Sequence, residues 1–381
     1  MKVLGIVGFI VALLLSVMIH EFGHYITARK FGMRVSEFFV GFGKRIWSYQ
    51  RGETEFGIKA IPAGGYCRID GMSKTDVMEP GQEGRAFYRA TSWRKLIVLG
   101  AGSFLHFLLG FLLFVVLFGA VGTTQMTSTI DKVSDPSPAK SAGLLSGDEI
   151  VAFNGARISN WRQDVQRINA TQGKSLAITI KRSGSEMTLD VSPKKIFHNG
   201  ESRWIIGITN KSALVRASFL RTFGDSYKVT KELIGSSAKA IVSLPAKLPA
   251  LWGQTFEGEK RDASGLVGIV GVARVSGEIT STSELTLGQR LGTFILIVAS
   301  LNIFIGVFNL LPILPLDGGH MAVAIADEVR ALYARLRRRV RPAAIDVNVL
   351  TPITAVVLVL LVLLTVLVLI ADIFNPVSIH L

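Results

Sequence analysis

The chain places two histidines and a glutamate at the end of an apolar stretch close to its first residue. Residues 16–30 read SVMIHEFGHYITARK, and Lys2 is the only charged residue before Glu21. His20 and His24 are four residues apart, so a helix puts them on one face, where their ring nitrogens can meet at one metal ion. Glu21 follows about 100° around the helix, beside the metal, which suits a general base acting on water. The pattern predicts a metal site with an acid–base carboxylate.

A catalytic zinc ion needs a third protein ligand and an open position for water. Suitable side chains in or beside other apolar runs are His106, Asp317 and His320. Asp317 belongs to FNLLPILPLDGGHMAVA, in which two prolines remove helix hydrogen bonds and two glycines permit irregular backbone. Irregular backbone at membrane depth is tolerated only where it lines a cavity inside the protein. An alternative role for Asp317 is to cap the helix that begins near Gly318.

The elements that must hold these residues are mostly membrane helices. The chain has 381 residues, of which 49% are hydrophobic, and this is too apolar for an ordinary soluble protein. Four apolar runs are long enough to cross a bilayer, and we assign them to residues 1–24, 96–122, 291–320 and 350–372. A signal peptide is the alternative for the first run, but no small-residue cleavage site follows it. We therefore expect a polytopic α-helical membrane protein with four transmembrane helices.

Basic residues indicate on which side of the membrane each loop lies. Residues 25–95 hold 13 Lys and Arg against 7 Asp and Glu, residues 330–341 contain six arginines, and no Lys or Arg follows Ala371. The positive-inside rule then puts residues 25–95 and 321–349 in the cytoplasm, and both termini and the large 123–290 region outside.

This topology also bears on the third ligand. The first and third spans both run inward, so His20 and Asp317 reach the cytoplasmic side at a similar depth, whereas His106 lies deeper. An inner-leaflet anchor explains the arginine run and the net charge of +14 better than a nucleic-acid partner does.

Three further regions lie between the spans. Residues 35–72 alternate in polarity around two turns, which predicts a membrane-associated β-hairpin sheet. Residues 126–195 combine strand patterns, a short Ser-Pro-Ala helix and Gly-Asp and Asn-Gly turns, which predicts a small inserted α+β domain. Residues 211–256 mix apolar and basic side chains and predict an amphipathic interfacial segment outside the membrane; a helix packed on the preceding domain is the alternative.

Four stretches together resemble the site-2 proteases, in particular the bacterial RseP-like group with an inserted PDZ domain. These stretches are HEFGH, FNLLPILPLDGG, GIKAIPAGGYCRIDG and the domain sequence SPAKSAGLLSGDEIVAFNG. The resemblance implies an intramembrane zinc metalloprotease of the bacterial inner membrane in which His20, His24 and Asp317 bind Zn2+ and Glu21 is the general base. It also implies that Asn309 helps to hold the substrate backbone, with packing against a neighbouring span as the alternative role.

One position departs from the family pattern. Many relatives carry Gly-Pro-x-x-Asn in the second span, whereas residues 102–106 here read GSFLH. We expect His106 to be a hydrogen-bonded histidine between helices, and contact with the substrate or the zinc shell is the alternative.

The resemblance also implies a class of substrate, namely single-span membrane proteins, commonly anti-sigma factors, cut after another protease has trimmed their outer domain. A transmembrane helix must unwind before attack, and we expect the edge of the 46–70 sheet to hold the unwound strand. The PDZ-like domain is expected to bind a peptide or substrate terminus, or to exclude untrimmed substrates together with residues 211–256.

Two other functions compete with proteolysis. A metal transporter would be expected to show internal repeats, and the sequence has no visible repeat. A non-catalytic membrane scaffold would not need Glu21 beside the two histidines.

Overall fold

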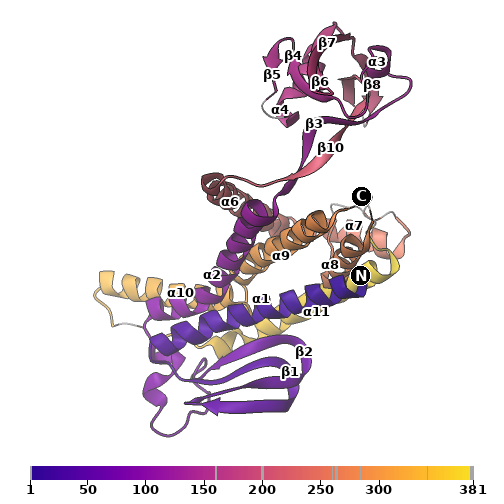
Figure 1. Ribbon diagram of the computed structural model, residues 1–381. Coiled ribbons are helices and arrows are strands. Elements are labelled where there is room, and N and C mark those ends of the chain that lie inside the picture. The colour runs from indigo at the N-terminus through magenta and orange to yellow at the C-terminus, as the bar shows by residue number, and fades with distance from the viewer. Residues whose placement is uncertain are drawn as a thin grey trace. The chain divides into compact units, whose positions relative to one another are not determined.

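The computed structural model describes residues 2–158, 161–198, 201–259, 261, 265–283, 285–340 and 342–377. The chain divides into two compact units (Figure 1). Unit 1 comprises Met1–Ala120 and Ala217–Leu381, and unit 2 comprises Val121–Arg216. Unit 2 is therefore an insertion in the chain of unit 1.

Among the residues of unit 1 that the structure describes, four helices are long and apolar enough to cross a membrane. They are α1 (Lys2–Lys30), α2 (Ser92–Val116, continued by a π-helical turn at Leu117–Val121), α9 (Leu287–Asn309) and α11 (Thr351–Phe374, preceded by a 3-10 turn at Val347–Leu350). α2 packs against both α1 and α9, whereas α11 packs on the shorter helices α7 (Leu244–Phe256) and α8 (Ile269–Ser281). The expectation of four apolar spanning helices is confirmed.

The helix boundaries differ from those expected at two of these spans. α1 continues to Lys30 rather than ending at residue 24, and its last turn carries Arg29 and Lys30, whose charges suit a helix C-terminus. α9 ends at Asn309, so the third span does not extend as a helix to residue 320. Residues 310–316 form a turn, because their two prolines cannot continue the helix, and α10 (Asp317–Leu336) begins after it.

The hairpin predicted between the first two spans consists of β1 (Val35–Arg51) and β2 (Thr54–Ile69). Besides pairing along the hairpin, residues 37–40 also pair with residues 55–58, so the hairpin curls back on itself. Gly41 and Gly43 have φ of 84° and 85°, a left-handed conformation that only glycine adopts readily, and they allow the bend. Two short 3-10 turns, Glu83–Arg85 and Phe87–Arg89, connect the sheet to α2.

Unit 2 is built on a six-stranded sheet with a core of its own. In the main path the strand order is β10-β3-β4-β6-β7, and β5 pairs with β4. The strands are β3 (Thr123–Val133), β4 (Glu149–Phe153), β5 (Ala156–Arg157), β6 (Leu176–Arg182), β7 (Ser185–Val191) and β10 (Ile208–Val215). Short helices α3 (Pro138–Ser141), α4 (Trp161–Asp164) and α5 (Gln166–Ala170) and the hairpin β8 (Lys194–His198) with β9 (Glu201–Ile205) complete it.

The limits of unit 2 are wider than the expected 126–195. The reason is that β10 pairs with β3 along its length, which brings residues 208–215 into the sheet. Alternating side chains of the central strands, among them Ile150, Ile178 and Ile180, fill the core with Leu144 and Phe153.

Residues 211–256 form a strand end and two helices rather than one amphipathic segment. Residues 211–215 belong to β10, and the rest forms α6 (Phe219–Val242) and α7, separated near Ser243 ahead of a proline in the first turn of α7. α6 packs on α2 and α9 and buries small polar side chains, Thr222, Ser226, Thr230 and Ser237. Its large apolar side chains, Phe219, Leu220 and Tyr227, remain exposed.

Candidate metal centre

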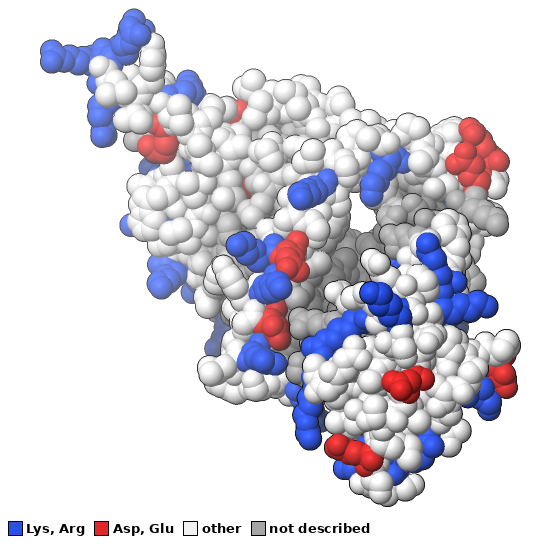
Figure 2. All heavy atoms as spheres, turned by 90° about the horizontal axis from the view of Figure 1, so that it is seen from above, with Lys and Arg blue, Asp and Glu red and all other residues white. Residues whose placement is uncertain are grey.

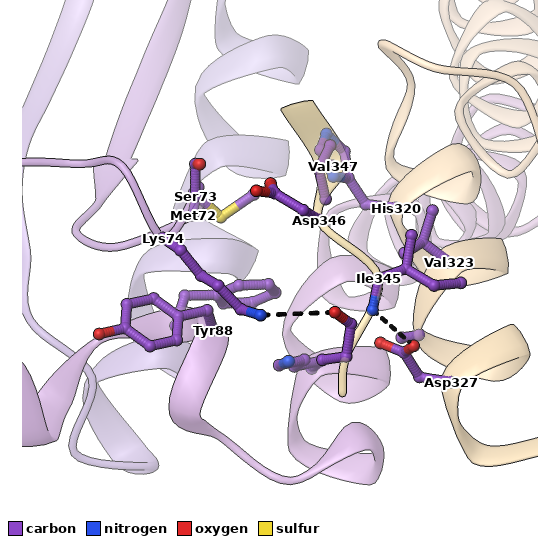
Figure 3. Close-up of a pocket in the computed structure, with 14 residues that line it drawn as sticks. Met72, Ser73, Lys74, Tyr88, His320, Val323, Asp327, Ile345, Asp346 and Val347 are labelled. Atoms are coloured by element: carbon purple, nitrogen blue, oxygen red, sulfur yellow. Dashed lines mark hydrogen bonds between the residues drawn. The ribbon is translucent and has the colours of Figure 1, made fainter. Parts of the chain in front are cut away.

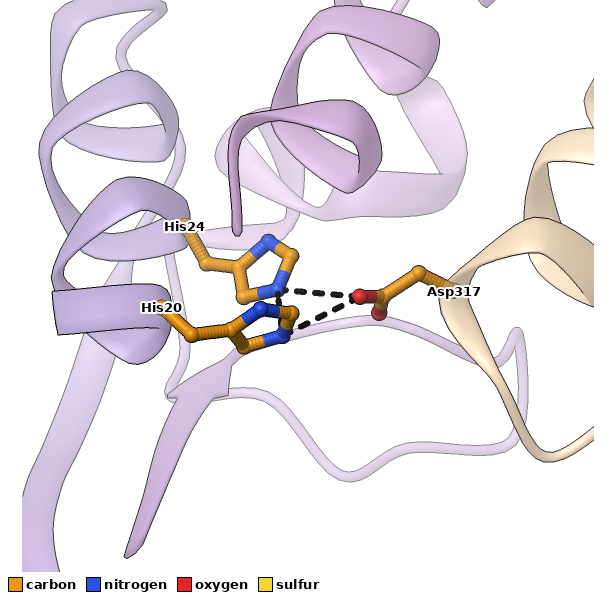
Figure 4. A group of neighbouring side chains, drawn as sticks. All are labelled: His20, His24 and Asp317. Carbon is orange, nitrogen blue, oxygen red and sulfur yellow. Dashed lines mark hydrogen bonds and ion pairs between the residues drawn. The ribbon is translucent and has the colours of Figure 1, made fainter. Parts of the chain in front are cut away.

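Three side chains converge from α1 and from the start of α10 (Figure 4). The Nε2 atoms of His20 and His24 are 3.0 Å apart, and Asp317 Oδ2 lies 3.2 Å from His20 Nε2 and 3.3 Å from His24 Nε2. Ligand atoms about 2.0–2.1 Å from a tetrahedral zinc ion lie about 3.3 Å apart, so these three distances fit a single ion. Two imidazoles and one carboxylate are also a ligand set that catalytic zinc adopts, with the fourth position left open.

Of the three candidates for the third position, Asp317 is the one whose carboxylate lies 3.2–3.3 Å from both histidine Nε2 atoms. In the part of the chain that the structure describes, the group that could hold a metal consists of His20, His24 and Asp317. His106 lies on α2, fully buried, and its Nδ1 donates a hydrogen bond of 2.8 Å to Asn302 Oδ1 on α9. The expectation that His106 is a hydrogen-bonded histidine between helices is thus confirmed.

Among the described residues, the remaining ligand candidate His320 and the expected substrate-binding residue Asn309 do not belong to this group. His320 lines a cavity with Val323 and Asp327 of α10 and with the segment Ile345–Val347 (Figure 3). Asn309 is the last residue of α9 and is half-buried, and its side chain makes no hydrogen bond with any residue that the structure describes.

The close contact of the 310–316 turn with α10 explains the two glycines after Asp317. A Cβ atom on Gly318 would lie 2.3 Å from the backbone carbonyl oxygens of Leu310 and Leu311, and one on Gly319 would lie 2.4 Å from the Leu314 nitrogen. No real Cβ atom approaches backbone so closely, so a larger residue would push the turn away from the helix. The glycines therefore hold the Asp317 carboxylate at the level of the two histidines.

The α1–α2 contact fixes the orientation of both imidazoles. His24 Nδ1 donates a hydrogen bond of 2.8 Å to the Val98 carbonyl of α2, which leaves Nε2 as the nitrogen with a free lone pair. A Cβ on Gly102 would lie 2.4–2.7 Å from three atoms of the His20 ring, so the ring rests directly on the α2 backbone.

Glu21 lies beside the ligand atoms and is held by the hairpin. Its Oε2 accepts a hydrogen bond of 2.9 Å from the backbone N–H of Cys67 on β2. Burial raises the pKa of the Cys67 thiol, and the nearby Glu21 charge raises it further. The carboxylate thus sits next to the three candidate ligands without belonging to their group, where it can accept or donate a proton.

The curled sheet has two free edges. Residues 55–58 pair with residues 37–40 on one side and with residues 47–50 on the other, so they lie in the interior of the sheet. The edges are residues 45–51 and 65–69. Because Cys67 N–H bonds Glu21, the 65–69 edge is the one that borders the metal group.

Sequence reasoning missed several residues that support the site. Asn302 is fully buried, and besides His106 it bonds Ser16 Oγ at 3.1 Å, which links α9 to α1. Gly102 and Val98 contact the two histidine rings. A polar residue in the middle of an apolar run was a signal for Asn302, but a glycine or a backbone carbonyl carries no such signal.

The sequence is similar to those of known proteins along nearly its whole length. The profile of Peptidase family M50 matches residues 8–364, a range that contains His20, Glu21, His24 and Asp317. Zinc metalloprotease Rip1 of Mycobacterium tuberculosis is 32% identical over 410 aligned residues, covering 100% of this chain and 99% of the relative. Zinc metalloprotease Rip1 of Mycolicibacterium smegmatis is 31% identical over 408 residues, covering 99% of this chain and 98% of the relative.

Proposed function

The chain belongs to peptidase family M50 and is a membrane zinc metalloprotease, and we propose that it cleaves the membrane-spanning segments of single-span proteins. The observation that carries the proposal is the group of His20, His24 and Asp317, whose ligand atoms lie within 4.8 Å of one another beside apolar spanning helices. Because these residues lie beside spanning helices, the peptide bond that is cleaved must reach them at the membrane. Anti-sigma factors trimmed by another protease are the proposed substrates.

The proposed roles follow from the positions of the four side chains. His20, His24 and Asp317 hold Zn2+, which when bound polarises the peptide carbonyl and lowers the pKa of water at the open position. Glu21 takes the proton of the attacking water and delivers it to the leaving amine nitrogen. Its neighbour in sequence is His20, so the carboxylate stays within reach of the reacting atoms.

The 65–69 edge of the hairpin is the proposed binding site for the unwound substrate strand. An added strand pairs through backbone groups, and Cys67 N–H is such a group pointing at the metal group. A substrate carbonyl that accepts the Cys67 hydrogen bond in place of Glu21 frees the Glu21 carboxylate to accept the proton of the attacking water. Asn309 at the end of α9 is proposed to donate a hydrogen bond from its side-chain amide to the substrate backbone.

The proposed orientation follows the basic residues of the sequence. The hairpin, the metal group and α10 lie toward the cytoplasm, and unit 2 and both termini lie outside. Unit 2, as the PDZ-like domain, binds a peptide or substrate terminus or blocks untrimmed substrates.

The deciding experiment compares wild type with Glu21→Gln in membranes that hold a trimmed single-span substrate. We expect Glu21→Gln to lose cleavage almost completely while it binds zinc as wild type does, because the amide cannot carry the proton but touches no ligand. Bound zinc is measured by elemental analysis of the purified protein. Glu55→Gln serves as the matched control, since this glutamate bonds Arg45 on the hairpin and lies outside the site.

Each outcome separates the competing functions. Equal cleavage by wild type and Glu21→Gln would exclude Glu21 as the base. Metal transport that survives Glu21→Gln, without any cleavage, would favour a transporter. A scaffold would retain its partners in both proteins and would cleave nothing.

A further inference from the structure

The helix that starts at Asp317 has one face that the protein leaves uncovered. Ile325, Val329, Leu332 and Leu336 follow each other at spacings of four, three and four residues and are 49%, 61%, 56% and 74% exposed. On a helix this spacing confines them to a stripe about 60° wide, along which Tyr333 is also exposed. Such a stripe is stable only against an apolar environment.

The opposite face of α10 is occupied by the protein. Ala324 and Ala334 are buried there, and Asp327 accepts a hydrogen bond of 2.8 Å from the Ile345 N–H. At the border of the stripe, exposed Glu328 accepts a hydrogen bond of 2.6 Å from Ser92 of α2. Figure 3 shows Asp327 bonded in this way inside the cavity that α10 shares with residues 344–347. These contacts fix the helix with its apolar stripe turned away from the rest of unit 1.

Basic side chains flank the stripe and gather at the end of the helix. Arg330, Arg335, Arg337, Arg338 and Arg339 are all exposed. In the described part of the chain, Arg330 pairs with Asp327 at 3.5 Å, and the other four have no acidic partner. Figure 2 shows the basic side chains clustered on the projection at the upper left, which is the α10 end of unit 1 in Figure 1.

The chain also confines α10 to one membrane face. Only residues 310–316 separate it from the end of α9, and α11 begins at Thr351, so both of its ends lead into spanning helices. A helix of 20 residues is about 30 Å long, so α10 would extend about 30 Å along the bilayer if it lay parallel to the surface.

We propose that α10 lies in the headgroup layer of the membrane and that the four arginines without an acidic partner bind anionic phospholipid headgroups. An apolar stripe flanked by arginines is the pattern of interfacial helices, and their charge is complementary to anionic lipid. Because Asp317 is the first residue of α10, the lipid contact also positions the carboxylate that lies against His20 and His24. The proposal concerns the surface of the helix and does not require that the proposed substrate class be correct.

The test places a nitroxide label on the stripe of the full-length protein in nanodiscs. Cys67 is the only cysteine, so Cys67→Ser with Leu332→Cys carries one label. In nanodiscs containing phosphatidylglycerol, we expect the label to be accessible to oxygen and shielded from a water-soluble relaxation agent. In the variant with glutamine at positions 335, 337, 338 and 339, the shielding should be lost, and lysine at the same positions should restore it.

Two controls keep the result specific. Glutamine at Lys174, Lys194, Lys195 and Lys211 removes the same charge from exposed positions of unit 2 and should leave the label shielded. Cleavage should be several-fold faster with phosphatidylglycerol than in purely zwitterionic lipid, at equal zinc content, and the glutamine variant should lose this difference.

Either of two results would overturn the proposal. One is a label at position 332 that is equally accessible to water in every lipid and every variant. The other is strong spin–spin coupling between two labelled copies, which would mean that a second copy of the chain covers the stripe. A helix buried in lipid with no activity in any membrane would refute the proposed function and leave this inference standing.

Discussion

At the scale of single residues, the metal group depends on how closely two helices approach. The His20 ring rests on the α2 backbone at Gly102, and Gly23 of α1 meets the Ala101 carbonyl so closely that a Cβ there would lie 2.8 Å from the oxygen. His20 Nδ1 is buried and has no hydrogen-bond partner among the described residues, so packing orients this ring where a hydrogen bond orients His24. Loss of a supporting contact of this kind commonly weakens metal binding about 10–100-fold.

We predict that Gly102→Ala lowers zinc affinity by about 10–100-fold, because the added methyl group displaces the His20 ring. Gly100→Ala is the matched control, since a Cβ there meets only the end of Met321 at an ordinary 3.8 Å. Both substitutions raise helix propensity equally, so that effect cancels. Zinc affinity is measured by competition with a chelator, and equal affinities for the two variants would contradict the role of Gly102.

At the scale of elements, the curled hairpin and the broken third span bring distant segments to one place. The bend at Gly41 and Gly43 turns residues 54–58 into the interior of the sheet, which leaves the 65–69 edge beside α1. The prolines between α9 and α10 interrupt the helix so that Asp317 opens a new one. A substrate strand that binds as proposed would therefore pair with this one edge.

We predict that the substrate strand pairs with the 65–69 edge, and disulfide cross-linking tests this. In a Cys67→Ser, Glu21→Gln background, Arg68→Cys on that edge should cross-link to single cysteines at alternate positions of the substrate, as expected for a paired strand. Gln50→Cys is the matched control, because residue 50 lies on the other edge of the sheet. Cross-links from position 50, or links at consecutive substrate positions, would exclude this mode of binding.

At the scale of the whole molecule, two features bear on function. They are the point at which unit 2 is inserted in the chain and the exposure of the fourth span. The Ala217 N–H donates a hydrogen bond of 2.9 Å to the Phe118 carbonyl, so the two chain ends that flank unit 2 are adjacent within unit 1. The most apolar window of the fourth span is 0% buried inside the protein. Lipid must cover this span, and a substrate helix can approach through the same surroundings.

We predict that unit 2 can be removed without loss of the active site. Replacing residues 121–216 by a short Gly-Ser linker should leave zinc content and cleavage of a trimmed substrate unchanged, because the flanking ends are already adjacent. If unit 2 excludes untrimmed substrates, the shortened protein should cleave them as well. Glu21→Gln in the shortened protein shows that any new cleavage comes from this site, and continued resistance of untrimmed substrates would contradict the filter.

Local patterns in the sequence determined the elements of this protein. Apolar length sets the four spanning helices, because a bilayer needs about 20 apolar residues. The spacing of His20 and His24 puts them on one helix face, and the prolines before Asp317 predict irregular backbone there, although the expected span ran on to residue 320. Each of these follows from interactions within a few residues.

Only the tertiary structure decided between residues of equal chemical suitability. His106, Asp317 and His320 all have suitable ligand atoms. Among the described residues, the packing of the 310–316 turn on Gly318 places a ligand atom of Asp317 with those of the two histidines, whereas His106, whose ring lies 5.0 Å from the His20 ring, bonds Asn302 instead. The edge of the sheet beside Glu21 likewise depends on pairing between residues far apart in sequence, and so does the face of α10 that the protein leaves bare. These features arise from contacts between distant segments, and local propensity carries no information about them.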